Sequence, residues 1–198
     1  LLGGSTHDGE ELLLARSARE LKREFPELEL VLVPRHAERG VEIASQLRGE
    51  GFDPVLRRGS ESAPASRDKD AMRVWIANTT GELRTWYQLA KLVVVGKSFH
   101  GIGGQNPVEP ILAGRPVVVG PHMENFAEVM TELLGVEGLR QVADEEALQG
   151  ALREFLADPD SGRSMAERGG STMARHEGSA MRNAEWVVKV LENRPVSE

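Results

Sequence analysis

The feature that most constrains the fold is a regular alternation of short apolar runs with amphipathic segments. The run Leu28–Val33 is almost unbroken in apolar residues, which is typical of a strand buried on both faces of a parallel sheet. Over residues 9–24, by contrast, apolar residues such as Leu13, Ala18 and Leu21 recur at helical spacing. Alternation of this kind, with short connecting loops, implies right-handed crossovers. The sequence therefore predicts an α/β, Rossmann-like, doubly wound parallel sheet of about six strands.

The pattern predicts one domain over residues 1–198. Residues 58–70 are polar and contain Pro and Ser, so we expect an exposed, mobile loop there. Residues 160–198 are expected to form closing helices. The expected strands are a stub at 1–3, followed by 28–33, 54–57, 73–77, 91–95, 116–119 and 139–142. The expected helices are 9–24, 37–50, 82–90, 106–113, 125–134, 144–157 and 161–193, the last interrupted near Gly169–Gly170 or Gly178.

Composition excludes several classes of function. A formal net charge of −7 argues against a surface that wraps nucleic acid. The absence of cysteine excludes disulfides and thiolate metal sites, and it fits a reducing cytoplasm. The five histidines stand in separate segments without ligand spacing, so we expect neither a metal site nor a cofactor. No G-x-S-x-G elbow is present either, which argues against a serine hydrolase.

Polar motifs follow the ends of four expected strands. In open α/β sheets, ligands bind at the carboxyl ends of the strands, near the point where the strand order reverses. Four chemically active segments therefore converge on one edge of the predicted sheet. They are Ser5-Thr6-His7, Pro34-Arg35-His36, Asn78-Thr79-Thr80-Gly81-Glu82 and Gly96-Lys97-Ser98.

The segment 96–126 gives the most specific chemical prediction. It is glycine-rich, and Asn106 and Pro107 suit the cap and first residue of a helix. Backbone N–H groups at such a helix start attract a phosphate. Glu109, one turn later, could accept hydrogen bonds from sugar hydroxyls. The segment lacks a dinucleotide fingerprint and a P-loop ending, so we interpret it as part of a nucleotide-sugar site.

Simpler explanations exist for the other three motifs. Arg35 suits a phosphate or a pyrimidine edge, but it also suits an ordinary surface loop. Residues 79–83 are typical of a helix start, where Glu82 matches the helix dipole. Residues 5–11 suggest a capping box, in which His7 is a weak candidate for acid–base chemistry.

Taken in order, these motifs resemble the carboxyl-terminal domain of 3-deoxy-D-manno-octulosonic acid (Kdo) transferase, a GT-B glycosyltransferase of lipopolysaccharide biosynthesis. The matching segments occur in family order over residues 3–126. One departure is Asn78, where the family usually has Asp. The segments are GSTHDGEE from Gly4, PRHAER from Pro34, Thr79–Leu83 with Tyr87, GKSF from Gly96, GGQNPVEP from Gly103 and GPHMENF from Gly120.

The resemblance implies a CMP-Kdo donor and a lipid A precursor as acceptor. It also implies that the amino-terminal domain, which supplies the general base and the membrane-facing acceptor surface, is absent from this chain. The chain is then half an enzyme, with no catalytic residue of its own beyond the weak candidate His7. The full-length protein would be cytoplasmic and peripheral on the inner face of the cytoplasmic membrane. The donor contacts implied by the resemblance are Pro34, Arg35, Thr80, Gly81, Glu82, Ser98, Gly103, Gly104, Asn106, Pro107, Val108 and Glu109.

Two alternatives remain open. One is another GT-B transferase, or a sugar-nucleotide epimerase, that uses a UDP-sugar. A diphosphate would favour a second basic residue near the glycine-rich loop, and Lys97 is the nearby candidate. The other alternative is a non-catalytic nucleotide-binding module.

Overall fold

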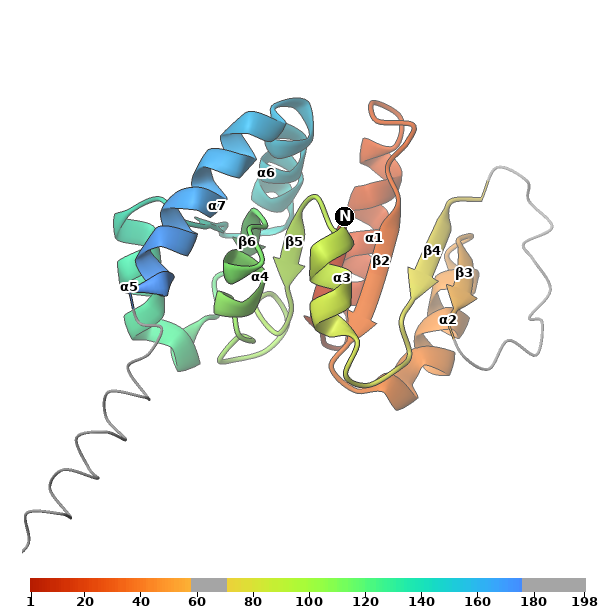
Figure 1. Cartoon of the computed structure of the whole chain (residues 1–198). Coiled ribbons are helices and arrows are strands. Elements are labelled where there is room, and N and C mark those ends of the chain that lie inside the picture. The colour runs from red at the N-terminus through yellow and green to blue at the C-terminus, as the bar shows by residue number, and fades with distance from the viewer. Residues whose placement is uncertain (58–70, 176–198) are drawn as a thin grey trace, which may run out of the picture.

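A computed structural model describes residues 1–57 and 71–175 of the chain, which form one seven-stranded sheet flanked by helices (Figure 1). Every strand pairing in it is parallel, so the expected Rossmann-like α/β fold is confirmed. The stub expected at 1–3 is a complete strand, which makes seven strands rather than about six. The strands are β1 Leu2–Thr6, β2 Leu30–Pro34, β3 Asp53–Leu56, β4 Arg73–Ile76, β5 Val93–Val95, β6 Val117–Val119 and β7 Arg140–Gln141.

The helices follow the expected positions closely. The expected helices at 37–50 and 125–134 each begin with a 3-10 turn, and the last described helix runs through Gly169 and Gly170 without the expected break. The expectations about residues 58–70 and Gly178 lie outside the described residues. The helices are α1 Glu10–Leu21, η1 Ala37–Arg39, α2 Gly40–Gly49, α3 Leu83–Leu89, α4 Val108–Leu112, η2 Glu124–Phe126, α5 Ala127–Gly135, α6 Glu145–Ala157 and α7 Pro159–Ala174.

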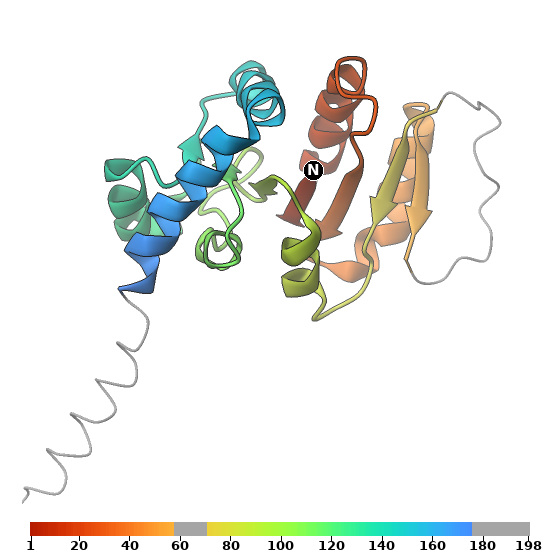
Figure 2. The same ribbon diagram turned by 45° about the horizontal axis from the view of Figure 1, so that its top comes forward.

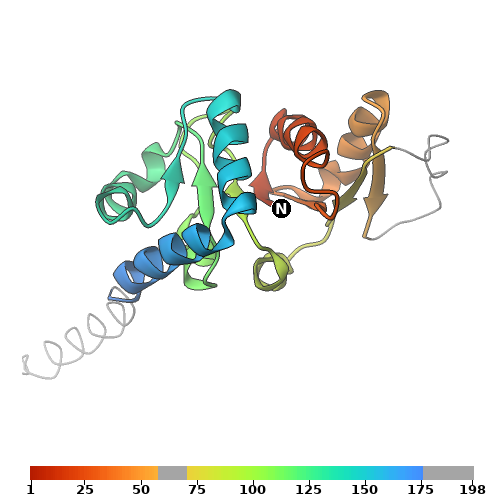
Figure 3. The same cartoon turned by 90° about the horizontal axis from the view of Figure 1, so that it is seen from above.

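Two apolar clusters form the core, one on each face of the sheet. Successive residues of a strand point to opposite faces, so Val94 joins one cluster while Val93 and Val95 join the other. The first cluster packs against α1, α2 and α6, and the second packs against α3, α4 and α5. Figure 3 shows α1 and α2 on one side of the sheet and α3 on the other. Helix α7 contributes Met165 to the first cluster and Met173 to the second, and it lies beside α4 and α5 (Figure 2).

The strand order is β3-β4-β2-β1-β5-β6-β7, and it reverses between β1 and β5. Backbone irregularities mark the carboxyl ends of these two strands. Ser5 and Lys97 have left-handed backbone angles, with φ of 54° and 56°, and the register of β1 shifts between Gly4 and Thr6. A Cβ on Gly96 would lie 2.4 Å from the carbonyl oxygen of Ser5, so only glycine allows the two segments to approach this closely. The reversal point, where such folds bind ligands, is therefore where the backbone is most unusual.

Candidate functional site

The loops that follow β1, β2, β4 and β5 meet at the carboxyl edge of the sheet. The loops after β2 and β4 run along the lower edge of Figure 1. Cross-loop contacts place the first, second and fourth of these loops together. The sequence prediction that polar motifs converge on one edge therefore holds for most of the site.

Glu10, the first residue of α1, is the centre of this edge. Its carboxylate is buried and accepts four backbone hydrogen bonds. Oε2 accepts from the N–H groups of His7 at 2.9 Å and Lys97 at 2.7 Å. Oε1 accepts from Ser98 at 2.9 Å and Phe99 at 3.0 Å. One side chain thus joins the loop after β1 to the glycine-rich loop after β5.

The neighbouring carboxylate, Glu11, is also buried but has different partners. Its Oε1 accepts from the Thr6 hydroxyl and from Nη1 of Arg39, both at 2.9 Å. Arg39 also donates to Asp8 at 3.1 Å, so it links the loop after β2 to the loop after β1. Oε2 of Glu11 has no hydrogen-bond partner among the described residues. Burial is the main cause that raises the pKa of Glu11, and it outweighs the opposing effects of backbone N–H groups and Arg39.

These contacts correct the capping box expected in residues 5–11. The residue that precedes α1 is Gly9, which makes no side-chain cap. Thr6 lies inside β1, and its hydroxyl donates to Glu11 instead of accepting from a helix N–H. Glu10 keeps one bond typical of a capping box, because it accepts from the N–H of His7 three residues earlier. Its other three bonds, and the bond between Glu11 and Arg39, join separate loops. Sequence reasoning assigned both glutamates to the local helix start and missed this role.

His7 lies between two loops of the edge. Its Nε2 is 3.1 Å from Nε2 of Gln105, and its ring stands edge-on to that of His36, with centroids 6.1 Å apart. Burial is the main cause that lowers the pKa of His7 from its ordinary value, which favours the neutral imidazole. A neutral imidazole could accept a proton, but its position beside Gln105 favours a role in joining the loops.

The glycine-rich loop uses most of its own N–H groups internally. Gly103 donates to the Glu124 carboxylate at 2.7 Å, while Gly104 and Gln105 donate to the carbonyls of Lys97 and Gly96. The bond from Gly103 and the amide of Glu124 itself lower the pKa of Glu124. The N–H groups of Gly104 and Gln105 therefore already have acceptors within the protein. Among the described residues, unpartnered N–H groups remain at 100–102 and Asn106.

Helix α4 begins at Val108, one residue later than expected, and Pro107 rather than Asn106 occupies the cap position. The side-chain oxygen of Asn106 accepts from the N–H of Val108 at 2.9 Å, and Pro107 precedes the first helical residue. The helix is shorter than expected. Glu109 is about 41% exposed, and its nearest cation is Arg84 on α3, at 3.9 Å. This carboxylate is therefore accessible to a ligand at the edge.

The remaining expected contacts differ in accessibility. Ser98 is fully buried, and its hydroxyl donates to the carbonyl of Val95 at 2.6 Å and accepts from the N–H of Gly120 at 2.9 Å. Pro34 is buried, whereas the side chain of Arg35 is exposed and has no partner among the described residues. The hydroxyl of Ser98 is thus committed to structure, while Arg35 is available to a ligand.

The loop after β4 packs against the start of α2, where a Cβ on Gly40 would lie 2.6 Å from Cβ of Asn78. Thr80 and Gly81 are exposed, and a Cβ on Gly81 would meet nothing within 4 Å. The Glu82 carboxylate accepts from Nε of Arg57 at 2.6 Å and from the Thr79 hydroxyl at 2.5 Å. A second bond, from Nη2 of Arg57 at 3.2 Å, completes a two-point contact between this loop and the end of β3.

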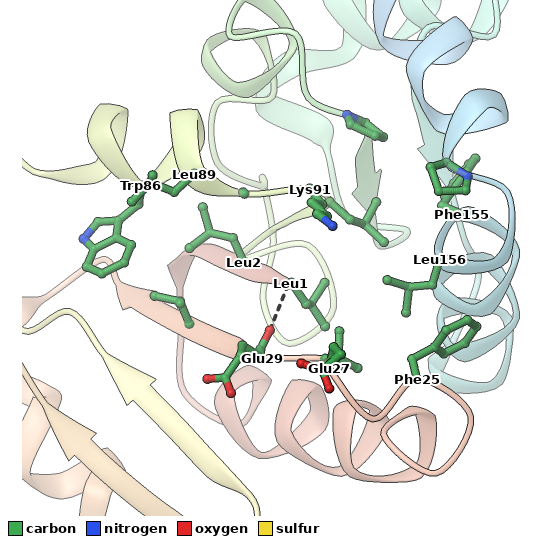
Figure 4. A pocket seen from close by; sticks show the side chains of 16 residues that line it. Leu1, Leu2, Phe25, Glu27, Glu29, Trp86, Leu89, Lys91, Phe155 and Leu156 are labelled. Carbon is green, nitrogen blue, oxygen red and sulfur yellow. Dashed lines mark hydrogen bonds between the residues drawn. The ribbon is translucent and has the colours of Figure 1, made fainter.

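A second hollow lies at the opposite, amino edge of the sheet (Figure 4). It has a volume of about 400 Å³, and its walls are mostly apolar. Leu2, Trp86, Leu89, Phe155 and Leu156 are among the residues that line it. Its charged groups include Glu27, Glu29 and Lys91, so two carboxylates face it, which does not favour a phosphate.

Two further observations concern the described residues as a whole. Within residues 1–57 and 71–175, no three histidine or acidic side chains gather as a metal ion would require. None of the helices in these ranges has the length and apolar character needed to cross a bilayer.

Comparison with known proteins identifies relatives over nearly the whole chain, although no family model matches. The chain is 31% identical to 3-deoxy-D-manno-octulosonic acid transferase of Haemophilus influenzae, over 96% of the chain and 44% of that protein. It is also 31% identical to the enzyme of the same name from Bordetella pertussis, over 90% of the chain and 41% of that protein. The chain thus spans less than half the length of these curated relatives.

A solved structure agrees with these sequence matches. The carboxyl-terminal CMP-Kdo binding domain of WaaA from Acinetobacter baumannii superimposes with a TM-score of 0.76 and 26% identity. The match covers 87% of each chain. The chain is therefore a homologue of the carboxyl-terminal domain of Kdo transferases, which are GT-B glycosyltransferases.

Proposed function

We propose that this chain is the donor-binding half of a Kdo transferase and that it binds CMP-Kdo through the carboxyl edge of its sheet. The observation that supports this most strongly is the match, over 87% of both chains, to a domain described as binding CMP-Kdo. The relatives are named as transferases of 3-deoxy-D-manno-octulosonic acid, and this name supports Kdo transfer as the reaction. As in the family resemblance, we propose a lipid A precursor of lipopolysaccharide biosynthesis as the acceptor.

The accessible groups of the edge suit the parts of such a donor. The exposed guanidinium of Arg35 can pair with a phosphate or hydrogen-bond a pyrimidine. Glu109 can accept hydrogen bonds from the two ribose hydroxyls, since its carboxylate is partly exposed and has only long contacts, to the side-chain amide of Asn106 at 3.5 Å and to Arg84 at 3.9 Å. The unpartnered N–H groups at 100–102 and Asn106 can hold phosphate oxygens. Thr80 and Gly81 are the accessible groups of the neighbouring loop.

The chemistry left to this domain is orientation and charge stabilisation. Cytidine monophosphate is a good leaving group, so its phosphate mainly needs donors that hold it in place as the bond to Kdo breaks. Transfer also needs a base that deprotonates the acceptor hydroxyl. His7, the local candidate, is turned toward Gln105. We therefore assign the base, the lipid acceptor site and the contact with the inner face of the cytoplasmic membrane to an amino-terminal domain.

The test is a transfer assay with CMP-Kdo and a lipid A precursor. The 198-residue chain alone should give no product above background, because a missing general base removes a factor of about 10²–10⁴. A fusion behind the amino-terminal half of the Haemophilus influenzae relative should give product, and Glu109→Gln in that fusion should lower the yield. Transfer by the chain alone would show that the base has been misplaced. A well-folded fusion that binds CMP but gives no product would contradict the proposed reaction.

A further inference from the structure

Three consecutive backbone N–H groups after β5 converge on one carboxylate, which belongs to the protein itself. The left-handed conformation at Lys97 turns the amides of Lys97, Ser98 and Phe99 toward Glu10. Successive amides arranged in this way form a concave site for an anion. Here the anion is a glutamate from α1, a helix that begins 87 residues earlier in the sequence.

The contact extends from residues 97–99 to the accessible part of the loop. The carbonyls of Gly96 and Lys97 accept hydrogen bonds from Gln105 and Gly104. These two residues lead directly to Asn106, whose side-chain oxygen accepts from the first N–H of α4, one residue before Glu109. A residue that fixes 97–99 therefore also fixes the start of α4.

We propose that Glu10 is the positioning residue of the donor loop: it sets the affinity for the nucleotide without touching it. This inference rests on the proposed function. With both oxygens of Glu10 filled by N–H donors, the loop is held in its binding conformation before the donor arrives, and binding needs less ordering. The same arrangement directs the donor phosphate away from 97–99 and toward the unpartnered N–H groups at 100–102 and Asn106.

Glu11 provides a matched control, since it is an equally buried carboxylate in the same helical turn. Its partners are Thr6 and Arg39, and it makes no bond to the glycine-rich loop. Loss of charge at Glu11 tests the general cost of removing a buried carboxylate. Loss of charge at Glu10 tests, in addition, whether this carboxylate holds residues 97–99 in place.

The experiment compares the wild-type chain with Glu10→Gln and Glu11→Gln. Amide hydrogen exchange by NMR reports the loop, and CMP titration calorimetry reports the site. An amide side chain at position 10 turns two of its four acceptor positions into donors. We expect exchange at Lys97, Ser98 and Phe99 to speed up by about tenfold or more, and CMP affinity to fall by about tenfold or more. Exchange at Val93, whose N–H donates to Pro116, reports the sheet and should not change. Glu11→Gln should leave exchange at 97–99 unchanged.

The outcomes separate the loop from the site. Unchanged exchange at 97–99 in Glu10→Gln overturns the proposal, and so does faster exchange with unaltered CMP affinity, because Glu10 would then be merely structural. If the wild-type chain does not bind CMP, the proposed function is wrong. The positioning role for the donor is then wrong as well, even if the exchange data show that Glu10 holds residues 97–99 in place. If Glu10→Gln does not fold, Glu10→Asp decides: a shorter carboxylate keeps the charge but cannot reach both loops. It should weaken exchange protection at 97–99 and CMP affinity together, while wild-type values for both would overturn the proposal.

Discussion

Replacing Ser98 by alanine should destabilise the protein without weakening nucleotide binding. The hydroxyl of Ser98 is fully buried and joins the end of β5 to the end of β6. Alanine removes the bond to the Val95 carbonyl, which costs about 1 kcal/mol. It also leaves the buried N–H of Gly120 without its acceptor, at a further cost of about 1–3 kcal/mol.

The expected loss is therefore about 2–4 kcal/mol in the free energy of unfolding. In a chain of this length, that loss lowers the melting temperature by roughly 5–15 °C. Urea unfolding and scanning calorimetry measure the effect, and CMP titration well below the melting temperature measures the site. Ser164→Ala, at an exposed position of α7, is the matched control and should change stability by less than about 0.5 kcal/mol. Wild-type stability combined with a loss of CMP affinity would refute the reasoning, because the hydroxyl would then face the ligand.

Three other substitutions test separate parts of the account. Glu109→Gln should cost about 1.5–3 kcal/mol in CMP affinity at nearly unchanged stability, measured by calorimetry, because the exposed carboxylate is available to the ribose; a stability collapse with unaltered affinity would make Glu109 structural. Gly96→Ala should cost about 1–3 kcal/mol or more in stability, since its Cβ would meet backbone 2.4 Å away. Gly150→Ala, in open space on α6, should instead stabilise by about 0.5–1 kcal/mol, and equal effects in a urea series would contradict the packing. Glu11→Gln should change the pH dependence of unfolding. Burial raises the native pKa of Glu11, so the native protein holds this proton more tightly than the unfolded protein does. The free energy of unfolding of the wild type, relative to that of the variant, should therefore fall as the pH rises from 4.5. A flat difference across that range would show that Glu11 ionises as freely in the native state as in the unfolded one.

The fold was largely predictable from the sequence, because hydrophobic periodicity survives without tertiary information. Apolar runs such as Leu30–Pro34 and Val117–Val119 are typical of strands in a parallel sheet that is covered on both faces. Helix ends were less predictable. A helix start near Asn106 was expected because its chemistry is local, although the cap position proved to be Pro107. The helix at Gly169–Gly170 stays unbroken, and Gly169 packs so closely against Gly138 that glycine is favoured there.

The location of the site was predictable from the sequence, but the hydrogen bonds within it were not. Strand ends define the edge, so residues such as Arg35 and Glu109 could be found from their place in the pattern. Glu10 could not, because nothing local distinguishes a glutamate that caps its own helix from one that binds amides 87 to 89 residues away. Ser98 and Gly104 followed the strand end as expected, yet their polar groups proved to be used inside the protein. Arg84 and Gln105 were missed, since only the folded chain brings them to Glu109 and His7.

The central claim is that this edge binds a cytidine monophosphate donor. Titration calorimetry of the 198-residue chain with CMP, UMP and UDP tests it most directly. The account predicts that CMP binds tighter than UMP and tighter than UDP, because the unpartnered N–H groups at 100–102 and Asn106 suit one phosphate and the exposed Arg35 can hydrogen-bond the pyrimidine edge. Tighter binding of UDP than of CMP would contradict the account and would favour a GT-B enzyme that uses a UDP-sugar.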